Sequence, residues 1–491
     1  MASGVPPLPD VSTILAEQNP WHQRGTVPDV LAPSVERPLA KSLWRRLLRD
    51  DPRRFLVVLG ARRVGKTTAM YQTVRHLLAA GIDAQRLWWM RLDHPVLLRA
   101  SLDELVRQAV DLAGATPQEP AFLLLDELVY AEDWDLWLKT FYDERWPVRI
   151  VATSSATAAL RGRRLESGVG RWLDLYLSPY SFSEFLDLVG HSAPVEVKAT
   201  LAETMQALPA RLPEPVNVAE LRRRFLLIGG FPELLVAERE PRDDDVNRLL
   251  RSQQLLRADA VERAVYKDIP QSYGVDNPMA LERLLYVVAA QVTGVLSPSK
   301  VAGELGLSQP TLDKYLGYLQ QAFLLFTLPS YAGAEESVQR RGRKVYFVDG
   351  AARNATLQSG LAPLDDPTEM GVLMENAAAA ALHALAEQTS VRLYHWRERG
   401  HEVDLVLDVP ARPLAFEIGS SVRHSRAGLT ALMARHPRFA GGCYLVSPDA
   451  PRVLADRSPS GIGTLPLDMF LIACGRQAAQ GLHARLVGTS G

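Results

Sequence analysis

The sequence is poor in cysteine, in lysine and in net charge. Its 491 residues include 2 cysteines, Cys443 and Cys474, which are far apart and have no histidine or cysteine at ligand spacing. Neither a disulfide framework nor a zinc site is therefore expected, and a reducing compartment fits. The formal net charge of −1 excludes a global attraction to nucleic acid or membrane, so any basic surface must be local. Nearly all positive charge is arginine, which makes each lysine more informative.

Long apolar runs are missing as well. No stretch reaches the roughly 18 apolar residues that a membrane-spanning helix needs. The N-terminal sequence "MASGVPPLPDVSTILAEQNPW" has no basic run followed by an apolar core, so no signal peptide is expected. We therefore expect a cytoplasmic protein with no membrane contact. A hydrophobic share of 47% and a charged share of 23% are typical of globular proteins, and this length favours two to four domains.

The first informative stretch is "FLVVLGARRVGKTTAMYQTVRHLLAAG". A buried strand over 55–59 is followed by a loop of the form G-x-x-x-x-G-K-[ST] and then by an amphipathic helix, which is the setting that a phosphate-binding loop requires. Backbone N–H groups of such a loop surround phosphate oxygens, the lysine reaches the β- and γ-phosphates, and the hydroxyl that follows coordinates Mg²⁺. The predicted ATP contacts are Gly60, Arg63, Gly65, Lys66, Thr67 and Thr68.

A second buried strand supplies the acids that this chemistry needs. "AFLLLDE" is apolar over 121–125 and ends in Asp126 and Glu127. We expect Asp126 to hold the Mg²⁺ shell and Glu127 to polarise the attacking water. A third strand, "VRIVATSSA", ends in Ser154, and polar residues at that end of a parallel strand face the nucleotide. Ser154 or Thr153 could sense the γ-phosphate, or simply form a turn.

The stretch "RWLDLYLSPYSFSEF" reads as the next strand. Arg171 stands just before it and is a candidate arginine for the transition state, in its own chain or toward a neighbouring subunit. A plain surface arginine is the competing interpretation.

These motifs together resemble one family. "GARRVGKTT", "LLLDE", "VATSS", "GVGR" with "LSPYSFSEF", and "GGFPELL" look like those of prokaryotic AAA-type ATPases that carry a C-terminal restriction-endonuclease-like domain. The resemblance implies a three-layer α/β ATPase core with a helical lid.

Farther along, "LSPSKVAGELGLSQPTLDKYLGYLQQAFLLFTLP" predicts a winged helix-turn-helix. Ser297 and Ser308 are expected helix caps, Gly306 a helix break, and "FLLFTLP" a strand. The exposed side of helix 309–320 would present Gln309, Thr311, Lys314 and Tyr318 to duplex DNA. That face carries few cations, which "QRRGRK" (339–344) could supply as a wing. DNA binding and protein docking both remain open.

The stretch "HEVDLVLDVPARPLAFEIGSS" predicts a hairpin that contains acids. A turn at 409–412 places Asp404 opposite Glu417, with Glu402 on the same face. Like charges so placed are costly unless a cation lies between them. By the family resemblance, Glu375, Asp404 and Glu417 look like an acidic nuclease triad that could hold Mg²⁺ or Mn²⁺. The family's lysine is missing, because its position is Gly419. A degenerate nuclease fold, an active nuclease with a displaced base (Arg423, His424 or Arg426), and an ordinary acidic hairpin remain as alternatives.

The predicted architecture is α/β. It consists of an N-terminal extension (1–40), an AAA-type P-loop core (41–182), a helical lid and connector (183–280), a winged helix (281–345) and an endonuclease-like domain (346–491). The predicted function is an ATP-hydrolysing switch that acts on DNA or on a protein partner and can form oligomers. The alternatives are an ATP-dependent nuclease and a non-hydrolysing ATP-binding scaffold.

Overall fold

The chain folds into two compact units, which are described separately. The computed structural model describes residues 10–49, 53–155, 170–193, 195–209, 217–232, 235, 245–331, 342–389, 391–410 and 412–487. The first unit comprises Met1–Gly60, Gly65–Leu177 and Leu486–Gly488, and the second comprises Ala61–Val64, Ser178–Arg485 and Thr489–Gly491. No helix in the described ranges is long and apolar enough to cross a membrane.

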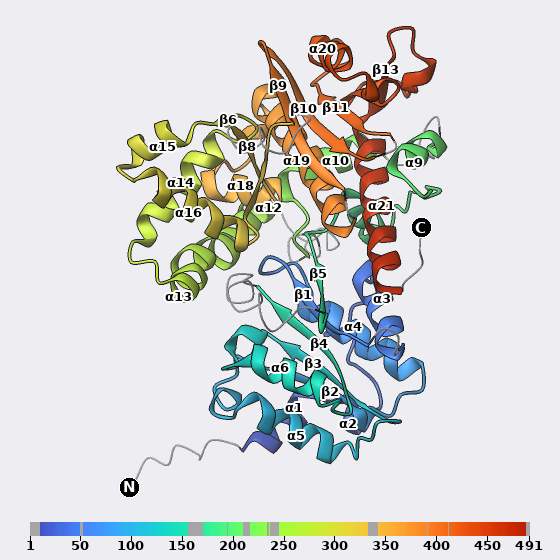
Figure 1. Ribbon diagram of the computed structural model, residues 1–491, viewed down its shortest axis with the longest axis vertical. Helices are drawn as coiled ribbons and strands as arrows, with labels where there is room; N and C mark the ends of the chain where they lie inside the picture. The colour runs from blue at the N-terminus through green and yellow to red at the C-terminus, as the bar shows by residue number, and fades with distance from the viewer. Residues whose placement is uncertain are drawn as a thin grey trace. The chain divides into compact units, whose positions relative to one another are not determined.

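The first unit is built on a parallel sheet of five strands in the order β2-β3-β4-β1-β5 (Figure 1). Parallel neighbours require crossover connections, and helices provide them. The strands are β1 (Phe55–Leu59), β2 (Leu87–Arg91), β3 (Ala121–Asp126), β4 (Val148–Ser154) and β5 (Trp172–Tyr176). The longer helices are α3 (Pro38–Leu48), α4 (Lys66–Ala79), α5 (Leu102–Leu112) and α6 (Trp134–Asp143). The buried strands predicted at 55–59 and 121–125 are confirmed.

The N-terminal segment covers the edge of this sheet at β2. Helices α1 (Val11–Gln18) and α2 (Trp21–Arg24) flank Asn19, whose side chain is fully buried. Its amide Nδ2 donates to the Trp89 carbonyl at 3.0 Å, and the Trp89 N–H donates to its Oδ1 at 2.6 Å. Asn19 thus satisfies backbone groups that an edge strand would leave unpaired, which gives "NPWHQRG" a structural role.

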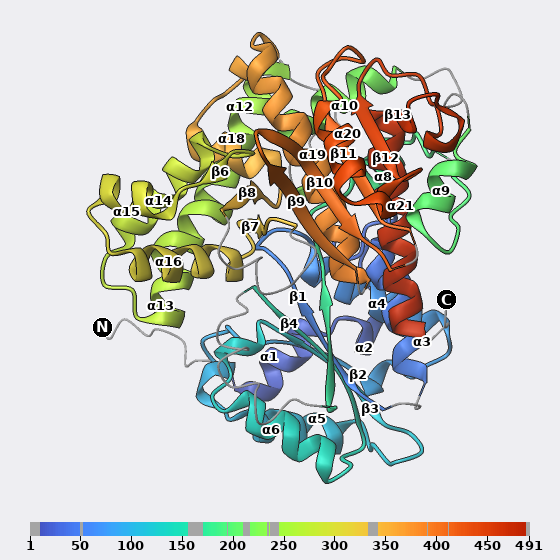
Figure 2. The same cartoon turned by 45° about the horizontal axis from the view of Figure 1, so that its top comes forward.

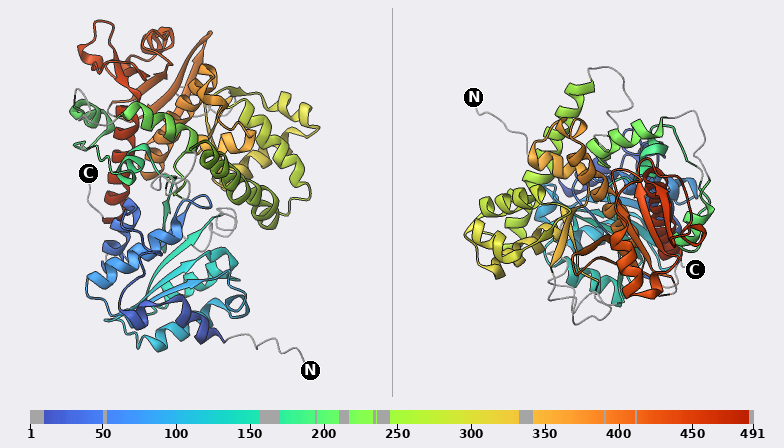
Figure 3. Two further views of the ribbon diagram at one scale, coloured as in Figure 1. Left: turned by 180° about the vertical axis from the view of Figure 1, so that it is seen from behind. Right: turned by 90° about the horizontal axis from the view of Figure 1, so that it is seen from above.

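The second unit begins with helices, and its described residues between 183 and 280 contain no strand. Helices α8 (Phe182–Leu188), α9 (Leu201–Ala207), α10 (Val218–Ile228), α12 (Asp245–Leu256) and α13 (Ile269–Tyr273) lie there. Two π-helical segments, Arg257–Glu262 and Ala264–Asp268, join α12 to α13. The helices α14 (Pro278–Ala290), α15 (Pro298–Leu305) and α16 (Gln309–Gln321) follow, and α12 to α16 gather in one group (Figure 3).

Helices α14 to α16 are accompanied by a small antiparallel sheet in the order β6-β8-β7. Its strands are β6 (Val295–Leu296), β7 (Leu325–Leu328) and β8 (Arg343–Phe347). Gly306 ends α15 with a φ of 66° and the Ser308 side chain caps α16, as predicted, whereas Ser297 lies at the start of α15 without a side-chain capping hydrogen bond. The apolar stripe of α16 is buried and consists of Leu312, Leu316 and Leu319.

A mixed sheet in the order β13-β12-β11-β10-β9 completes the unit (Figure 2). Its strands are β9 (Arg392–Glu398), β10 (His401–Asp408), β11 (Leu414–Ile418), β12 (Cys443–Ser447) and β13 (Ile462–Pro466). The accompanying helices are α18 (Gly350–Leu357), α19 (Pro367–Gln388), α20 (Ala427–Arg435) and α21 (Leu467–Val487). Leu429 of α20 packs in one core with Ala415, whereas Phe470 of α21 contacts Phe416. Since consecutive strand residues face opposite ways, α20 and α21 cover opposite faces.

Two of the motifs quoted above meet inside this unit. The Tyr180 N–H donates to the Gly230 carbonyl at 2.7 Å, and the Gly230 N–H donates to Asp349 at 2.7 Å. A Cβ on Gly230 would lie 2.1 Å from the Tyr180 carbonyl oxygen, so only glycine fits this close approach. Burial raises the pKa of Asp349 to about 6. The "SPYSFSEF" and "GGF" stretches therefore form one structural junction.

Candidate functional site: a phosphate loop and an acidic cluster

The predicted phosphate loop joins β1 to α4. Gly65 caps α4 with a φ of 90°, a conformation that favours glycine. Lys66 is buried, and its ammonium donates to the Gly60 carbonyl oxygen at 2.9 Å. Arg63 is exposed with a φ of 66°, and Thr68 lies half-buried in the first turn of α4. The Lys66 ammonium thus lies at the loop, beside a backbone carbonyl.

Asp126 lies at the carboxyl end of β3 and accepts hydrogen bonds from two hydroxyl groups. Thr67 donates to its Oδ2 at 2.8 Å, and Thr153 donates to its Oδ1 at 2.5 Å. Burial, followed by the neighbouring Glu127 charge, raises the pKa of Asp126, although both hydroxyls favour its ionised form. A cation beside this carboxylate would relieve the cost of its buried charge.

Glu127 leaves the strand in a left-handed conformation with a φ of 57°. Its N–H donates to the Thr153 Oγ1 at 3.1 Å, and Ser155 donates to its Oε2 at 3.0 Å. Residues with positive φ other than glycine are uncommon and concentrate at functional sites. The side chain of Glu127 is therefore held in one orientation beside Asp126.

These residues fit ATP and Mg²⁺. The Thr67 hydroxyl and the Asp126 carboxylate approach within 2.8 Å, and both offer the hard oxygen ligands that Mg²⁺ requires. No group of three or more His, Cys, Asp or Glu side chains at metal-binding geometry occurs among the described residues. An ion that shares its ligands with substrate phosphates does not need such a group.

Two further predicted residues, Ser154 and Arg171, lie at opposite edges of the parallel sheet. Ser154 is fully buried at the carboxyl end of β4, paired in register with Leu59 of β1, and so lies at the loop edge of the sheet. Arg171 precedes β5, and its carbonyl accepts from the Phe55 N–H at the start of β1. It lies at the opposite edge and forms a bidentate ion pair with Asp143, at 2.8 and 2.9 Å. A role for Arg171 at the loop of its own chain does not fit this position.

The acidic hairpin has the predicted register. Leu405 pairs with Phe416 and Leu407 with Leu414, and continuing this register sets Asp404 opposite Glu417. A metal ion was the expected cation at these acids, but the positive charge that contacts Asp404 belongs to a lysine from another part of the chain. Lys344 of β8 is 1% exposed.

The Lys344 ammonium contacts three carboxylates. Its Nζ lies 2.6 Å from Glu402, 2.8 Å from Asp404 and 3.2 Å from Glu375. The three acids hold the pKa of Lys344 well above its usual range in spite of burial. The Tyr346 hydroxyl also donates to Glu375, at 2.8 Å. The three carboxylates balance the charge of Lys344. The sequence alone did not predict Lys344 as part of this site.

Glu417 has a different partner. His424 lies 3.3 Å from Glu417, so one of the three basic residues considered as substitutes does reach the acids. Burial raises the pKa of Glu417 to about 7 and that of Glu375 to about 8. A Cβ on Gly419 would lie 2.5 Å from the Cβ of His424. The position of the missing family lysine is therefore blocked by His424.

Two expectations about the predicted DNA-binding surface are wrong, one in the helix and one in the wing. Tyr318 is buried, because its ring stacks on Tyr273 with centroids 3.8 Å apart, and it is not on an exposed face. Lys344 cannot serve as a wing cation, because it is buried among the acids. Of "QRRGRK", residues 339–341 lie outside the described residues, and Arg343 is exposed. Gln309 and Lys314 remain exposed.

The chain matches three family models in succession. Residues 52–186 match an AAA domain (AAA_14), residues 219–362 a domain of unknown function (DUF8612), and residues 370–456 another domain of unknown function (DUF4143). With the loop and the parallel sheet described above, the first match makes residues 52–186 a P-loop domain of the AAA type.

Similar proteins come from distant prokaryotes. An uncharacterised protein of Methanocaldococcus jannaschii, MJ1637, is 23% identical over 398 residues, 79% of this chain and 80% of that protein. An uncharacterised protein of Haemophilus influenzae is 22% identical over 302 residues, 60% of this chain and 68% of its own length. Among solved structures, the Walker-type ATPase PABY2304 of Pyrococcus abyssi is 15% identical with a TM-score of 0.44, covering 66% of this chain and 98% of that one.

Proposed function

We propose that this protein binds ATP with Mg²⁺, hydrolyses it, and uses the nucleotide state to control the binding of a partner. One observation carries the proposal. At the carboxyl edge of the parallel sheet, the hydroxyls of Thr67 and Thr153 converge on Asp126, and Glu127 stands next to it. Nucleotides bind at this edge in open α/β sheets.

The loop residues account for binding. Lys66 lies at the loop and donates to the Gly60 carbonyl, and its ammonium would bind the β- and γ-phosphates when a nucleotide takes the place of that contact. Because Gly65 caps α4, the first N–H groups of α4 point toward the same place, and the helix dipole favours an anion there. Mg²⁺, held by Thr67 and Asp126, would neutralise phosphate charge.

Glu127 accounts for turnover. The hydrogen bond from Ser155 to Oε2 fixes the carboxylate and leaves Oε1 to orient a water molecule and accept its proton. A scaffold that binds ATP without hydrolysing it would not need a carboxylate held in this way.

The Glu127→Gln variant tests the assignment. It should bind ATP as the wild type does and hydrolyse it about 10²- to 10⁴-fold more slowly, measured by phosphate release and by nucleotide titration. Glu132→Gln is the control, since Glu132 is an exposed acid a few residues farther on, and it should keep full activity. Normal hydrolysis by Glu127→Gln would remove Glu127 from the mechanism.

An ATP hydrolysis assay of the full chain identifies the class of partner. Rates are measured with and without duplex DNA at two salt concentrations. The exposed Gln309 and Lys314 of α16 support a DNA-binding winged helix, whereas the burial of Tyr318 and Lys344 reduces the surface for it. Stimulation that weakens with salt indicates DNA. Hydrolysis indifferent to DNA indicates a protein partner. Arg171 stays a candidate only toward a neighbouring subunit.

Nuclease activity is the second candidate, because Lys344 does reach two acids of the expected triad, Glu375 and Asp404. We favour a degenerate nuclease fold, since that lysine is bonded to three carboxylates and cannot act as a base while it is protonated. The expected result is no Mg²⁺- or Mn²⁺-dependent cleavage of single- or double-stranded DNA. Cleavage that disappears in Asp404→Ala would establish the nuclease instead.

A further inference from the structure

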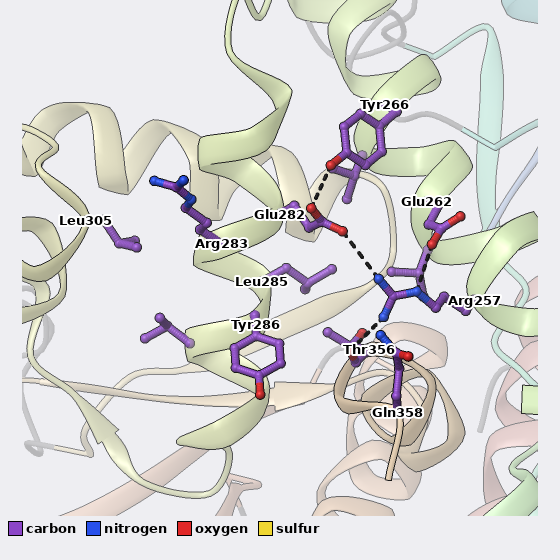
Figure 4. Close-up of a pocket in the computed structure, with 13 residues that line it drawn as sticks. Arg257, Glu262, Tyr266, Glu282, Arg283, Leu285, Tyr286, Leu305, Thr356 and Gln358 are labelled. Atoms are coloured by element: carbon purple, nitrogen blue, oxygen red, sulfur yellow. Dashed lines mark hydrogen bonds and ion pairs between the residues drawn. The ribbon is translucent and has the colours of Figure 1, made fainter. Parts of the chain in front are cut away.

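A separate cavity lies in the second unit where the π-helical segments meet α14, α15 and the end of α18. Its volume is about 320 Å³, at the lower end of the roughly 300–1,000 Å³ of ligand pockets. The residues that line it are Arg257, Val261, Glu262, Val265, Tyr266, Glu282, Arg283, Leu285, Tyr286, Val287, Leu305, Thr356 and Gln358 (Figure 4). Its floor is apolar, since Val261, Val265 and Leu285 are buried.

The backbone around the cavity is unusual in two independent ways. Two consecutive π-helical segments supply one wall, and π-helical turns are rare and frequent at functional sites. Gln358 ends α18 in a left-handed conformation with a φ of 54°. Strain of this kind is kept where the surrounding structure has a use for it.

Most of the charge in the cavity is already neutralised. Arg257 donates to Glu262 at 2.7 Å and to the Thr356 carbonyl at 3.0 Å, and it lies 3.4 Å from Glu282. The Tyr266 hydroxyl also donates to Glu282, at 2.6 Å. The two acids and Arg257 thus satisfy one another, and together they leave one negative charge on this side of the cavity.

Arg283 is the exception. It is exposed and has no hydrogen-bond or ion-pair partner among the residues that the structure describes. Figure 4 shows its guanidinium on the side of the cavity away from Arg257, toward Leu305. An incoming group that completes this site should therefore carry a negative charge, which a planar guanidinium binds well.

Two exposed tyrosines, Tyr266 and Tyr286, line the same cavity, and the exposed Met279 precedes Arg283 by one turn of α14. Tyr266 is 46%, Tyr286 55% and Met279 57% exposed. Met279 and Tyr286 are seven residues apart on α14, so they lie on one helix face with Arg283 between them. Apolar surface with a polar rim marks protein interaction sites, and Tyr and Arg contribute most to such interfaces.

We propose that this cavity binds a segment of a partner protein that carries an aromatic side chain followed by an acidic one. The aromatic ring packs on the floor between Tyr286 and Leu305, and the carboxylate pairs with Arg283. This proposal rests on the partner-dependent function above, but peptide binding can be measured without nucleotide, so the two can fail separately.

The test uses two blocked dipeptides, acetyl-Trp-Glu-amide and acetyl-Trp-Gln-amide, with the full chain in saturation-transfer NMR. The Glu peptide should bind about two- to fivefold more tightly than the Gln peptide, as expected for a partly exposed ion pair. Arg283→Gln should remove that difference and leave the Gln peptide unchanged. Tyr286→Ala should weaken both, and Arg399→Gln, which removes an exposed arginine elsewhere, should change neither.

Because Arg283 and Tyr286 are exposed, the variants should unfold thermally like the wild type, and that curve is the folding control. Three results would overturn the proposal. The first is that the wild-type protein transfers no saturation to the indole protons of either peptide. The second is that the wild type binds both peptides equally, and the third is that Arg283→Gln still prefers the Glu peptide. Self-association of the wild type that Tyr286→Ala abolishes would also overturn it, since a second copy would then cover this face.

Discussion

Two regions of this protein combine a buried lysine with carboxylates beside the strands of a sheet, and they do so in opposite ways. At the phosphate loop, Lys66 donates to the Gly60 carbonyl, and Asp126 is bonded to hydroxyl groups. In the acidic cluster, Lys344 is bonded to Glu375, Glu402 and Asp404. The Lys66 ammonium lies at the phosphate loop beside a backbone carbonyl, whereas Lys344, surrounded by three acids, is a structural counter-ion.

The largest expected effect comes from removing that counter-ion. Lys344→Met should cost about 3–5 kcal/mol of unfolding free energy, because it leaves buried carboxylates without a cation. Urea denaturation of the full chain measures this. Lys300→Met, which removes a lysine that is 71% exposed, should stay within about 0.5 kcal/mol of the wild type.

A second substitution identifies the cause. If unpaired charge is what destabilises Lys344→Met, then adding Asp404→Asn should recover part of the loss, because one of the stranded carboxylates is removed. Additive losses in the double variant would mean that Lys344 acts through packing and not through charge.

Lys66→Ala should have the next largest effect, and on binding instead of stability. Loss of a buried charge that reaches phosphate oxygens should weaken ATP binding by about a hundredfold, equivalent to about 3 kcal/mol. Fluorescent-nucleotide titration measures it. Lys139→Ala, outside the loop, should bind ATP normally, and an equal loss in both variants would contradict a direct contact of Lys66 with the nucleotide.

How far the sequence could predict these two regions depends on the distance between partners along the chain. The phosphate loop is local, so strand, glycines and helix follow from one short stretch. The hairpin register follows from one turn. Lys344 meets Glu375 and Asp404 across 31 and 60 residues, and no local pattern contains that contact. Two signals were available: lysine is scarce in this chain, and the alternation of β8 puts Lys344 and Tyr346 on one face.

Two other residues differ in how far their positions could be predicted. Arg171 precedes a parallel strand, and the amino end of such a strand lies at the edge away from the nucleotide, so its position could have been predicted. Tyr318 lies beside the apolar stripe of α16, and its ring stacks on Tyr273 of α13. Tertiary contacts of this kind override helical phase and are not visible in the sequence of α16.

Substitutions at Gly419 test why this position does not hold the lysine of the family, and their expected effect on stability is smaller. Gly419→Lys and Gly419→Ala should both cost about 1–3 kcal/mol, because the Cβ itself collides with His424. Gly303→Ala is the matched control, since an added Cβ there meets nothing within 4 Å and a helical glycine gains about 0.5–1 kcal/mol as alanine. A harmless Gly419→Ala with a costly Gly419→Lys would instead place the conflict farther along the lysine side chain.

The smallest expected effect is a pH dependence of the acidic cluster. The pKa values of Glu417 and Glu375, about 7 and about 8, are above the ordinary 4.5. Within that window the folded state therefore holds protons that the unfolded state has released. The free energy of unfolding must then fall as pH rises from about 5 to about 8. The raised pKa of His424 beside Glu417 acts in the same direction, because its folded-state stabilisation is lost as pH rises through that pKa.

The difference between wild type and Glu417→Gln isolates this contribution from the other acids of the chain. Urea midpoints at about pH 5 and about pH 8 should show the wild type losing on the order of 1 kcal/mol more than the variant. Glu304→Gln, on the surface with Lys300, should follow the wild type. Equal losses in wild type and Glu417→Gln would mean that Glu417 is already ionised at low pH, and that His424, and not burial, determines its charge.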